Sequence, residues 1–412
     1  MADLTRRSNT AIDHAHSGCC GYPHAIRGEE WDLASTSRVV NALGAVSRIG
    51  DLLAEHGARS VLIVTDSGLR GTGMVDHLEA SITKQRLAVT VHSAIPANPS
   101  TASLDVAAQA ARDCRADHIV AFGGGSALDA AKAVALLART DLSAERLTGD
   151  EPIDDVLPIA AIPTTAGTGA ETNGFGVMES SDHRKVYIGS DKTVPALVIL
   201  DAELTTALPA AVTAASGFDA IIHGVESLLS RGATTLSRAF AAESLRLTTA
   251  APVKAVKEPD LETRSRMMTG AHLAGRALTV SGLGLVHGIG HSITATTGTP
   301  HGSALAAIAG PALRFGIDAA PASYRELARA LSLDVTGTDG ADRAVQLIVG
   351  IASEIGLPGT AGEVGVSEEL IDTIVTKTLD DAVTSNTPRH PSRDELTDLL
   401  ATNLSTAGER AR

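Results

Sequence analysis

The sequence predicts two domains, an α/β domain built on a parallel sheet followed by an all-α domain. Apolar, strand-like runs alternate with helix-like segments up to about residue 200, and the strand signals stop after about residue 206. A chain of 412 residues with 44% hydrophobic content can bury two cores. We expect residues 35–206 to form the first domain and residues 207–412 the second.

The first half reads as repeated strand–helix–strand units, which is typical of parallel strands covered by helices. The run at residues 60–65 is SVLIVT, and the run at residues 118–122, HIVAF, leads directly into glycines. The predicted strands are Ser60–Thr65, Leu87–His92, His118–Phe122, Leu157–Ile162 and Ala196–Leu200, with helices at Val46–His56 and Val106–Cys114.

The second half shows helical spacing throughout, so we expect it to be all-α. The predicted helices include Ser237–Thr248, Leu261–Leu278, Ala304–Phe315, Ser323–Leu331, Asp342–Ile355 and Glu368–Val375. Residues 1–34 have no sustained period, and we interpret them as a flexible lead-in without a function.

Charge and composition exclude several classes of function. A net charge of −14 disfavours nucleic acid, and no apolar stretch is long enough to span a membrane. The N-terminus lacks the apolar segment of a secretory signal, and three cysteines are too few for a disulfide framework. We therefore expect a cytoplasmic protein that acts on small molecules.

A glycine-rich turn follows the predicted strand 118–122. Residues 123–132, GGGSALDAAK, open a helix, and backbone N–H groups at a helix start can bind a phosphate. The run is not the G-x-G-x-x-G fingerprint, and by itself it fits a simple tight turn equally well.

A second polar turn, PTTAGTGAE at residues 163–171, follows another predicted strand, and Asp66 ends the strand 60–65. Two such turns at the same sheet edge predict a dinucleotide site there, although the second could also be a helix cap. A carboxylate at Asp66 would accept bonds from ribose hydroxyls and repel a 2′-phosphate, which favours NAD over NADP; alternatively, Asp66 caps a helix.

Histidines gather in three glycine-bounded segments of the second half. Asp219 and His223 are four residues apart, as are His287 and His291, and His301 follows shortly afterwards. A single histidine in an apolar segment is usually a core residue, but three imidazoles and one carboxylate from this set of four histidines and Asp219 would suit a divalent ion.

Together these motifs resemble the iron-containing, group III alcohol dehydrogenases over approximately residues 37–405. The segments that carry the resemblance are GGGSALDAAK (123–132), PTTAGTGAE (163–171), GFDAIIHGVE (217–226), GLGLVHGIGH (282–291) and TPHG (299–302). The resemblance implies a Rossmann-like nucleotide domain, a helical domain of the dehydroquinate synthase-like architecture, and a metal in the cleft between them.

The resemblance also assigns residues, position by position. The family's metal ligands correspond to Asp219, His223, His287 and His301, and the histidine that assists proton transfer corresponds to His291. Cofactor contacts correspond to Gly124, Gly125, Ser126, Thr164, Thr165 and Thr168, with Asp66 at the adenosine end and looser matches at Asn98 and Lys185. The implied cofactors are NAD(H) and one Fe²⁺, with Zn²⁺ as the alternative because both ions accept imidazole and carboxylate.

The chain departs from the family near the expected substrate. The usual HAMAHPLGA reads HGIGHSITA here, and Ala-Phe-x-Asn-Ala reads Ala277-Leu278-Thr279-Val280-Ser281. Arg276 is a cation on the same segment, which could face an anionic substrate group or, alternatively, lie on the surface.

The resulting hypothesis is an NAD(H)-linked, metal-dependent alcohol dehydrogenase or aldehyde reductase for a small alcohol or aldehyde, acting as a homodimer. The alternatives are a transhydrogenase that retains its NAD, a lyase of the dehydroquinate synthase type, and a non-enzymatic binding protein. Retention of the whole ligand set and His291 argues against the binding protein and against metal-free reductases.

Overall fold

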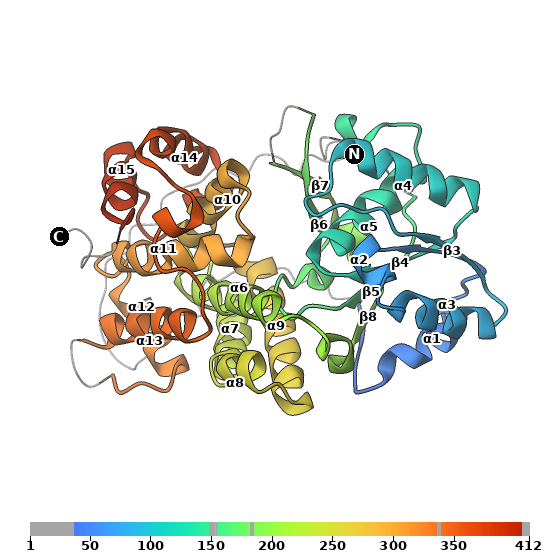
Figure 1. The fold of residues 1–412 in the computed structure, drawn as a ribbon, viewed down its shortest axis with the longest axis horizontal. Helices are drawn as coiled ribbons and strands as arrows, with labels where there is room; N and C mark the ends of the chain where they lie inside the picture. The colour runs from blue at the N-terminus through green and yellow to red at the C-terminus, as the bar shows by residue number, and fades with distance from the viewer. Residues whose placement is uncertain (1–36, 148–152, 154, 182–184, 336–338, 406–412) are drawn as a thin grey trace. The chain divides into compact units, whose positions relative to one another are not determined.

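A six-stranded parallel sheet organises the first half of the protein in this computed structural model (Figure 1). The structure describes residues 37–147, 153, 155–181, 185–335 and 339–405, all within one compact unit of the chain. The expected lead-in, residues 1–34, lies outside them. Across the sheet the strand order is β1-β8-β5-β4-β2-β3, and every neighbouring pair is parallel. The strands are β1 (Arg38–Asn41), β2 (Ser60–Val64), β3 (Ala88–His92), β4 (His118–Gly123), β5 (Ile159–Pro163) and β8 (Leu197–Leu200).

Each face of the sheet has its own core, because successive residues of a strand point to opposite faces. Val61 and Ile63 of β2 pack in the core that contains α1 (Ile49–Glu55) and α3 (Met74–Lys84). Leu62 and Val64 pack in the core of the other face, with α4 (Thr101–Asp113) and α5 (Gly125–Leu137). Helices on both faces explain why these strands are continuous apolar runs.

The chain reverses its direction of travel across the sheet between β2 and β4. After β2 it moves outward to β3, and after β3 it returns to β4 on the other side of β2. This is the position where open α/β sheets bind ligands, outside the carboxyl ends of the strands. The glycine run after β4 and Asp66 after β2 both lie there.

A two-stranded antiparallel hairpin, β6 (Phe175–Glu179) and β7 (Lys185–Gly189), was not predicted from the sequence. It is held against α5: the buried Lys132 donates to Asn173 Oδ1 at 3.1 Å and to the Phe175 carbonyl, and Asp129 Oδ2 accepts from Val177 N at 3.1 Å. The helix that begins at the glycine run therefore also positions this hairpin.

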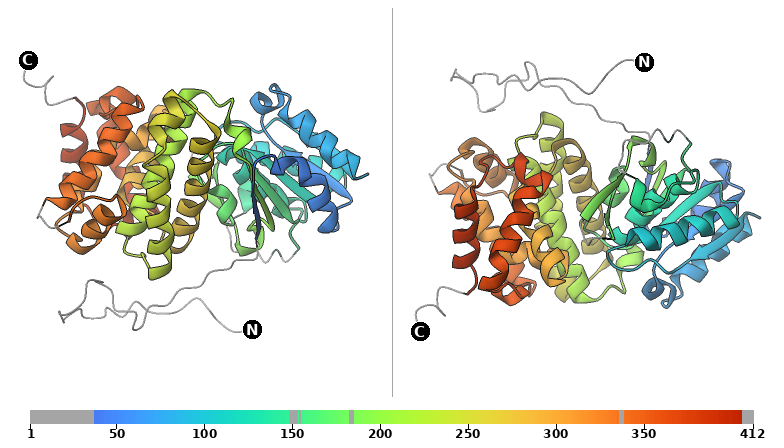
Figure 2. Two further views of the ribbon diagram at one scale, coloured as in Figure 1. Left: turned by 90° about the horizontal axis from the view of Figure 1, so that it is seen from below. Right: turned by 90° about the horizontal axis from the view of Figure 1, so that it is seen from above.

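After β8 the described elements are all helices, as Figure 2 shows, so the predicted fold class is confirmed. Its helices are α6 (Ala210–Leu229), α7 (Thr235–Thr248), α8 (Pro252–Lys257), α9 (Leu261–Ser281), α10 (Leu285–Thr297), α11 (His301–Phe315), α12 (Pro321–Ala330), α13 (Gly340–Glu354), α14 (Glu368–Asp380) and α15 (Arg393–Thr402). Short 3₁₀ turns and α2 (Ser67–Arg70) complete the described elements. No helix in the described part of the chain combines the length and apolar character needed to cross a membrane.

The turn after β5 packs directly against α9 of the helical half. Gly169 has a φ of +63°, and a Cβ atom there would lie 2.5 Å from the Cα of Gly275 on α9. Beside this contact, Nδ1 of His272 lies 2.9 Å from Oε1 of the buried Glu171. Only glycine at both positions allows the two backbones to approach this closely.

Candidate metal and cofactor site

The central helix of the second half, α6, carries Asp219 and His223 one turn apart. Phe218, Ile221 and Ile222 anchor the helix in the core, and α6 is buried continuously from Gly217 to Leu229. The carboxylate and the imidazole are consequently buried as well, with relative exposures of 3% and 5%. Burial of two polar side chains without a partner would be costly, so their surroundings must satisfy them.

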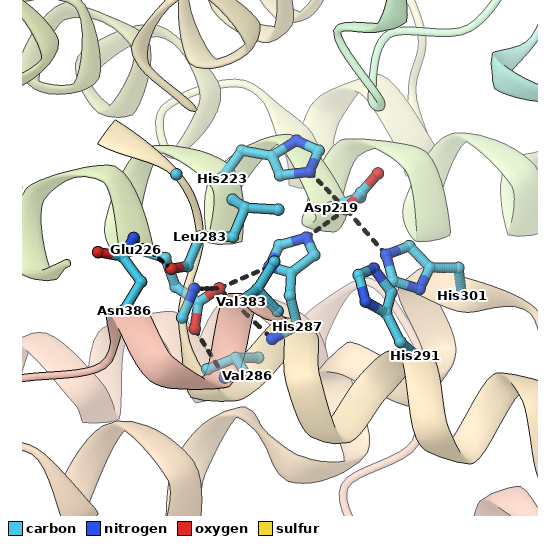
Figure 3. Close-up of polar contacts among 12 residues, drawn as sticks. Asp219, His223, Glu226, Leu283, Val286, His287, His291, His301, Val383 and Asn386 are labelled. Carbon is cyan, nitrogen blue, oxygen red and sulfur yellow. Dashed lines mark hydrogen bonds and ion pairs between the residues drawn. The ribbon is translucent and has the colours of Figure 1, made fainter. Parts of the chain in front are cut away.

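Two other helices bring imidazoles to Asp219. His287 lies in the first turn of α10, and His301 begins α11. The Nε2 atoms of His223, His287 and His301 lie 3.3, 3.3 and 3.6 Å from the same atom, Oδ1 of Asp219 (Figure 3). Three segments separated in sequence therefore converge on one carboxylate oxygen.

The ligand atoms of Asp219, His223 and His287 lie within 4.8 Å of one another. His301 is at the edge of this group, with 31% of its side chain exposed. The rings of His223 and His287 stack, with centroids 4.7 Å apart and an interplanar angle of 11°. One carboxylate oxygen has two lone pairs and cannot accept bonds from three imidazoles, whereas a cation among these atoms would bind all of them. The residues therefore fit a divalent metal ion.

The charges of the metal-free cluster are also set by burial and by these contacts. Burial opposes ionisation of Asp219, but His223 and the His287 bond outweigh it and hold the pKa of Asp219 well below its usual range. Burial also disfavours the protonated form of His287, but hydrogen bonds with Asp219 and Glu226 raise its pKa to about 9. Burial lowers the pKa of His223 to about 4, despite the attraction of Asp219. At neutral pH the cluster thus holds an anionic carboxylate, a protonated His287 and a neutral His223.

His291 lies one turn beyond His287 on α10 and faces a different partner. Its Nδ1 is 2.8 Å from Oδ2 of Asp381, and its ring stacks on that of His301 with centroids 5.2 Å apart. His291 has no contact with Asp219 among the hydrogen bonds and ion pairs of the described residues. His291 therefore lies beside the three imidazoles but is hydrogen-bonded to a different carboxylate.

A cavity of about 480 Å³ connects the histidine cluster to the glycine-rich turn. Of the predicted cofactor residues, Asn98, Gly125, Ser126 and Thr168 line it. A Cβ atom on Gly125 would lie 2.8 Å from Cγ2 of Thr168, so the turns after β4 and β5 are in contact. Gly124 is the N-cap of α5 and makes no side-chain cap bond, which leaves helix-start N–H groups for a phosphate.

Among the described side chains, those of Asp66, Thr164 and Thr165 lie outside the lining of this cavity. Thr164 is buried, and its N–H donates to the Gly123 carbonyl at 2.9 Å. The side chain of Thr165 lies beside Gly124, because a Cβ atom there would be 3.5 Å from Cγ2 of Thr165. Asp66 Oδ1 caps α2 by accepting from Leu69 N at 2.8 Å, and Oδ2 lies 3.6 Å from where a Cβ of Gly123 would be. The helix-cap alternative for Asp66 is therefore realised, beside the glycine run. Lys185 begins β7, and its side chain lies outside the described part.

A second hollow, of about 540 Å³, lies near the amino ends of β2 and β4. No histidine lines it, and Arg59 in its wall has 90% of its side chain exposed. We assign the chemistry to the histidine-lined cavity because titratable groups converge there.

Two residues of the site were not identified from the sequence. Glu226 contacts His287 through Nδ1, and Asp381 contacts His291. Glu226 carries a signal that could have been used, since it is three residues after His223 and seven after Asp219 on the same helix. Asp381 carries none, because 90 residues separate it from its partner.

Comparison with known proteins covers nearly the whole described chain. Residues 36–202 match the family model for iron-containing alcohol dehydrogenase, and residues 213–404 match that for the C-terminal part of the Fe-containing alcohol dehydrogenase family. An NAD-dependent methanol dehydrogenase of Bacillus methanolicus is 30% identical over 367 residues, which are 88% of this chain and 96% of that protein. A 4-hydroxybutyrate dehydrogenase of Cupriavidus necator is 32% identical over 376 residues, 88% of this chain and 96% of that protein.

Solved structures of similar proteins have the same fold as this chain. A 1,3-propanediol oxidoreductase superimposes with a TM-score of 0.88 at 28% identity, covering 91% of this chain and 100% of that one. A sulfoacetaldehyde reductase from Bifidobacterium kashiwanohense, solved in complex with NAD⁺, gives a TM-score of 0.85 at 28% identity, covering 92% and 100%. The chain belongs to the iron-containing alcohol dehydrogenase family and is an oxidoreductase that acts on CH–OH groups with NAD.

Proposed function

We propose that this protein interconverts a small, neutral aldehyde and its alcohol with NAD(H), and that Asp219, His223, His287 and His301 hold one divalent metal ion. The observation that carries this proposal is the convergence of three imidazole Nε2 atoms on Oδ1 of Asp219, in the wall of the cavity that reaches the glycine-rich turn. When bound, the metal supplies Lewis acidity toward the substrate oxygen, and the nicotinamide supplies or accepts the hydride.

The cofactor would lie along the carboxyl edge of the sheet, in the domain formed by residues 35–206. Helix-start N–H groups around Gly124, Gly125 and Ser126 favour its pyrophosphate. Asn98, Thr164, Thr165, Thr168 and Lys185 complete the proposed contacts. Asp66, beside the glycine run, would accept from the adenine ribose and repel a 2′-phosphate, so we propose NAD rather than NADP. The metal domain, residues 207–412, closes the other side.

His291 is the proposed proton carrier. It lines the cavity next to His301, and its Nδ1 is oriented by Asp381. An imidazole exchanges protons readily near neutral pH, so His291 can pass a proton between the substrate oxygen and solvent. His291 has its own carboxylate partner, Asp381, and contacts the cluster around Asp219 only through its ring.

The wall of the cavity near the histidines is mainly apolar, which favours a neutral substrate. Leu278, Leu283 and Val383 line it, and its described side chains include no Lys or Arg. Arg276 is buried on α9 but does not line this cavity, so the structure offers no support for an anionic substrate group held by Arg276. Burying a second, anionic group of a substrate among these apolar side chains would be costly without a Lys or Arg to pair with it.

The ion is proposed to be Fe²⁺, with Zn²⁺ as the alternative, because three imidazoles and one carboxylate suit both. A cytoplasmic location and a homodimer remain predictions. The homodimer is suggested by the prevalence of two-fold assemblies among homo-oligomers.

The test combines elemental analysis of the purified protein with NADH oxidation over neutral and anionic aldehydes, comparing wild type with His287→Ala. We expect one metal per chain and turnover of neutral aldehydes in the wild type, with both lost in the variant. His118→Ala is the control, because His118 is a buried histidine paired with Asp117 outside the cavity. An active protein without metal would refute the proposal, and NAD that cannot be removed would indicate the transhydrogenase instead.

A further inference from the structure

Glu226 is a buried carboxylate on the same face of α6 as Asp219 and His223. Only 4% of it is exposed, and it bonds across to the start of α10 (Figure 3). Oε1 accepts from Val286 N at 2.6 Å, and Oε2 accepts from Gly284 N at 3.1 Å and from His287 N at 3.4 Å. One carboxylate thus satisfies three of the N–H groups that a helix start leaves without an intrahelical partner.

The residue that should cap α10 cannot do so itself. Gly284 occupies the N-cap position and has no side chain to accept a bond. A Cβ atom on Gly284 would lie 3.0 Å from Oε1 of Glu226, so the glycine makes room for the carboxylate. Glu226 therefore serves as the cap of a helix that begins 58 residues later in the chain.

The same carboxylate also contacts a proposed metal ligand. Oε2 of Glu226 lies 2.6 Å from Nδ1 of His287. Because both carboxylate oxygens already accept backbone bonds, the shared hydrogen belongs to Nδ1, which donates. When a bound ion displaces the second proton of the ring, the unshared pair is therefore at Nε2, the atom that lies 3.3 Å from Asp219 Oδ1.

We propose that Glu226 is a positioning residue that keeps a hydrogen on Nδ1 of His287, so that Nε2 is the atom that binds the divalent ion. This inference rests on the proposed metal site. The carboxylate also joins α6, which carries Asp219 and His223, to the start of α10, which carries His287, so it sets the spacing of the ligands. A hydrogen bond from an imidazole to a carboxylate makes the other ring nitrogen more basic and therefore a stronger metal ligand.

A purely structural cap would behave differently from a positioning residue in Glu226→Gln. The glutamine carbonyl can still accept backbone bonds, but its NH₂ group faces either a backbone N–H or Nδ1 of His287. If it donates to Nδ1, the hydrogen of the ring moves to Nε2 and blocks the metal-binding atom. We expect the dissociation constant for Zn²⁺, measured by chelator competition, to rise by about 10- to 100-fold.

Asp201→Asn is the matched control, because Asp201 is also a buried carboxylate that accepts three backbone N–H bonds. Its partners are Gly44, Val46 and Glu203, each at 3.1 Å, and none of its hydrogen bonds in the described part of the chain involves a histidine. We expect this variant to lower the melting temperature of the metal-free protein without changing its Zn²⁺ affinity. Wild-type affinity in Glu226→Gln, or an equal loss in Asp201→Asn, would overturn the proposal.

Two further measurements keep the inference testable. If Glu226→Gln does not fold, Glu226→Asp keeps the charge but withdraws it from Nδ1, and it should also weaken Zn²⁺ binding. Histidine labelled with ¹⁵N in the metal-free protein should show a slowly exchanging, deshielded N–H signal that is absent in the variant. If the wild type binds no metal, the proposed function fails; persistence of that signal in Glu226→Gln refutes the role of Glu226 separately.

Discussion

Nδ1 of His291 lies 2.8 Å from Oδ2 of Asp381, although 90 residues separate the two in the chain. Oδ1 of the same carboxylate accepts from Val383 N at 3.1 Å, so Asp381 is itself held in place. His291 lines the cavity, and 24% of its side chain is exposed. This arrangement suits a group that exchanges protons with solvent.

His291→Ala should lower kcat by about 100-fold, since a positioned acid–base group contributes about 10²- to 10⁴-fold. Metal content should stay at the wild-type value, because His291 does not contact Asp219. Steady-state kinetics and elemental analysis on the same preparation measure both. Asp381→Asn should reduce kcat less, because the imidazole remains but loses its orientation. Loss of metal in His291→Ala would place His291 among the ligands instead.

Metal binding should strengthen as the pH rises toward 9. Burial lowers the pKa of His287, but hydrogen bonds with Asp219 and Glu226 outweigh burial and raise this pKa to about 9. The metal-free protein therefore holds a proton on His287, and a bound ion must displace that proton. One displaced proton makes the apparent dissociation constant fall by about tenfold per pH unit below that value. Chelator competition over a pH series checks the slope, and an affinity independent of pH would contradict it.

The same proton affects the stability of the metal-free fold. The stabilisation that this proton gives is complete below a pH of about 6.5, the pKa of histidine in the unfolded chain. It is lost as the pH rises through about 9, the pKa of His287 in the folded protein. Denaturation of the metal-free protein at a series of pH values should therefore show that the contribution of His287 to the free energy of unfolding decreases between about pH 6.5 and pH 9. His287→Gln should remove the decrease.

Leu278→Ala should shift the substrate preference toward bulkier aldehydes. Leu278 lines the cavity, and its removal leaves room for a branched side chain while weakening contact with short substrates. We expect kcat/KM for short aldehydes to fall and the ratio of branched to short substrates to rise by about tenfold. Leu247→Ala on α7 is the control, because Leu247 is partly buried outside the cavity lining. Equal changes for all aldehydes would contradict a specificity role.

Asp66→Asn should increase the use of NADPH relative to NADH. The asparagine can still cap α2, but it removes a charge that would repel a 2′-phosphate. Two like charges about 4 Å apart repel by about 1 to 4 kcal/mol near a protein surface, so kcat/KM for NADPH should rise by roughly tenfold or more. The ratio of NADPH to NADH turnover measures this, and an unchanged ratio would place Asp66 away from the ribose.

The sequence by itself determined the elements that have a strong local pattern. The strands at Ser60–Val64 and His118–Gly123 were predictable because a sheet covered on both faces requires unbroken apolar runs. The hairpin β6–β7 was not, because each of its short strands is stabilised by the other and by Lys132 and Asp129 on α5. The resemblance to the family could also be recognised from the sequence, because the motifs occur in the family's order along the chain. The family models confirm it over residues 36–202 and 213–404.

Within the site, the helical period alone placed Asp219 with His223 and His287 with His291, since residues four apart share a face. Only the tertiary structure decided that His287 turns to Asp219 and Glu226 while His291 turns to Asp381, and that Arg276 does not line the cavity. The physical reason is that these contacts depend on how α6, α9, α10 and the turn after α14 pack together. Sequence spacing fixes the face of one helix, but packing fixes which neighbour that face meets.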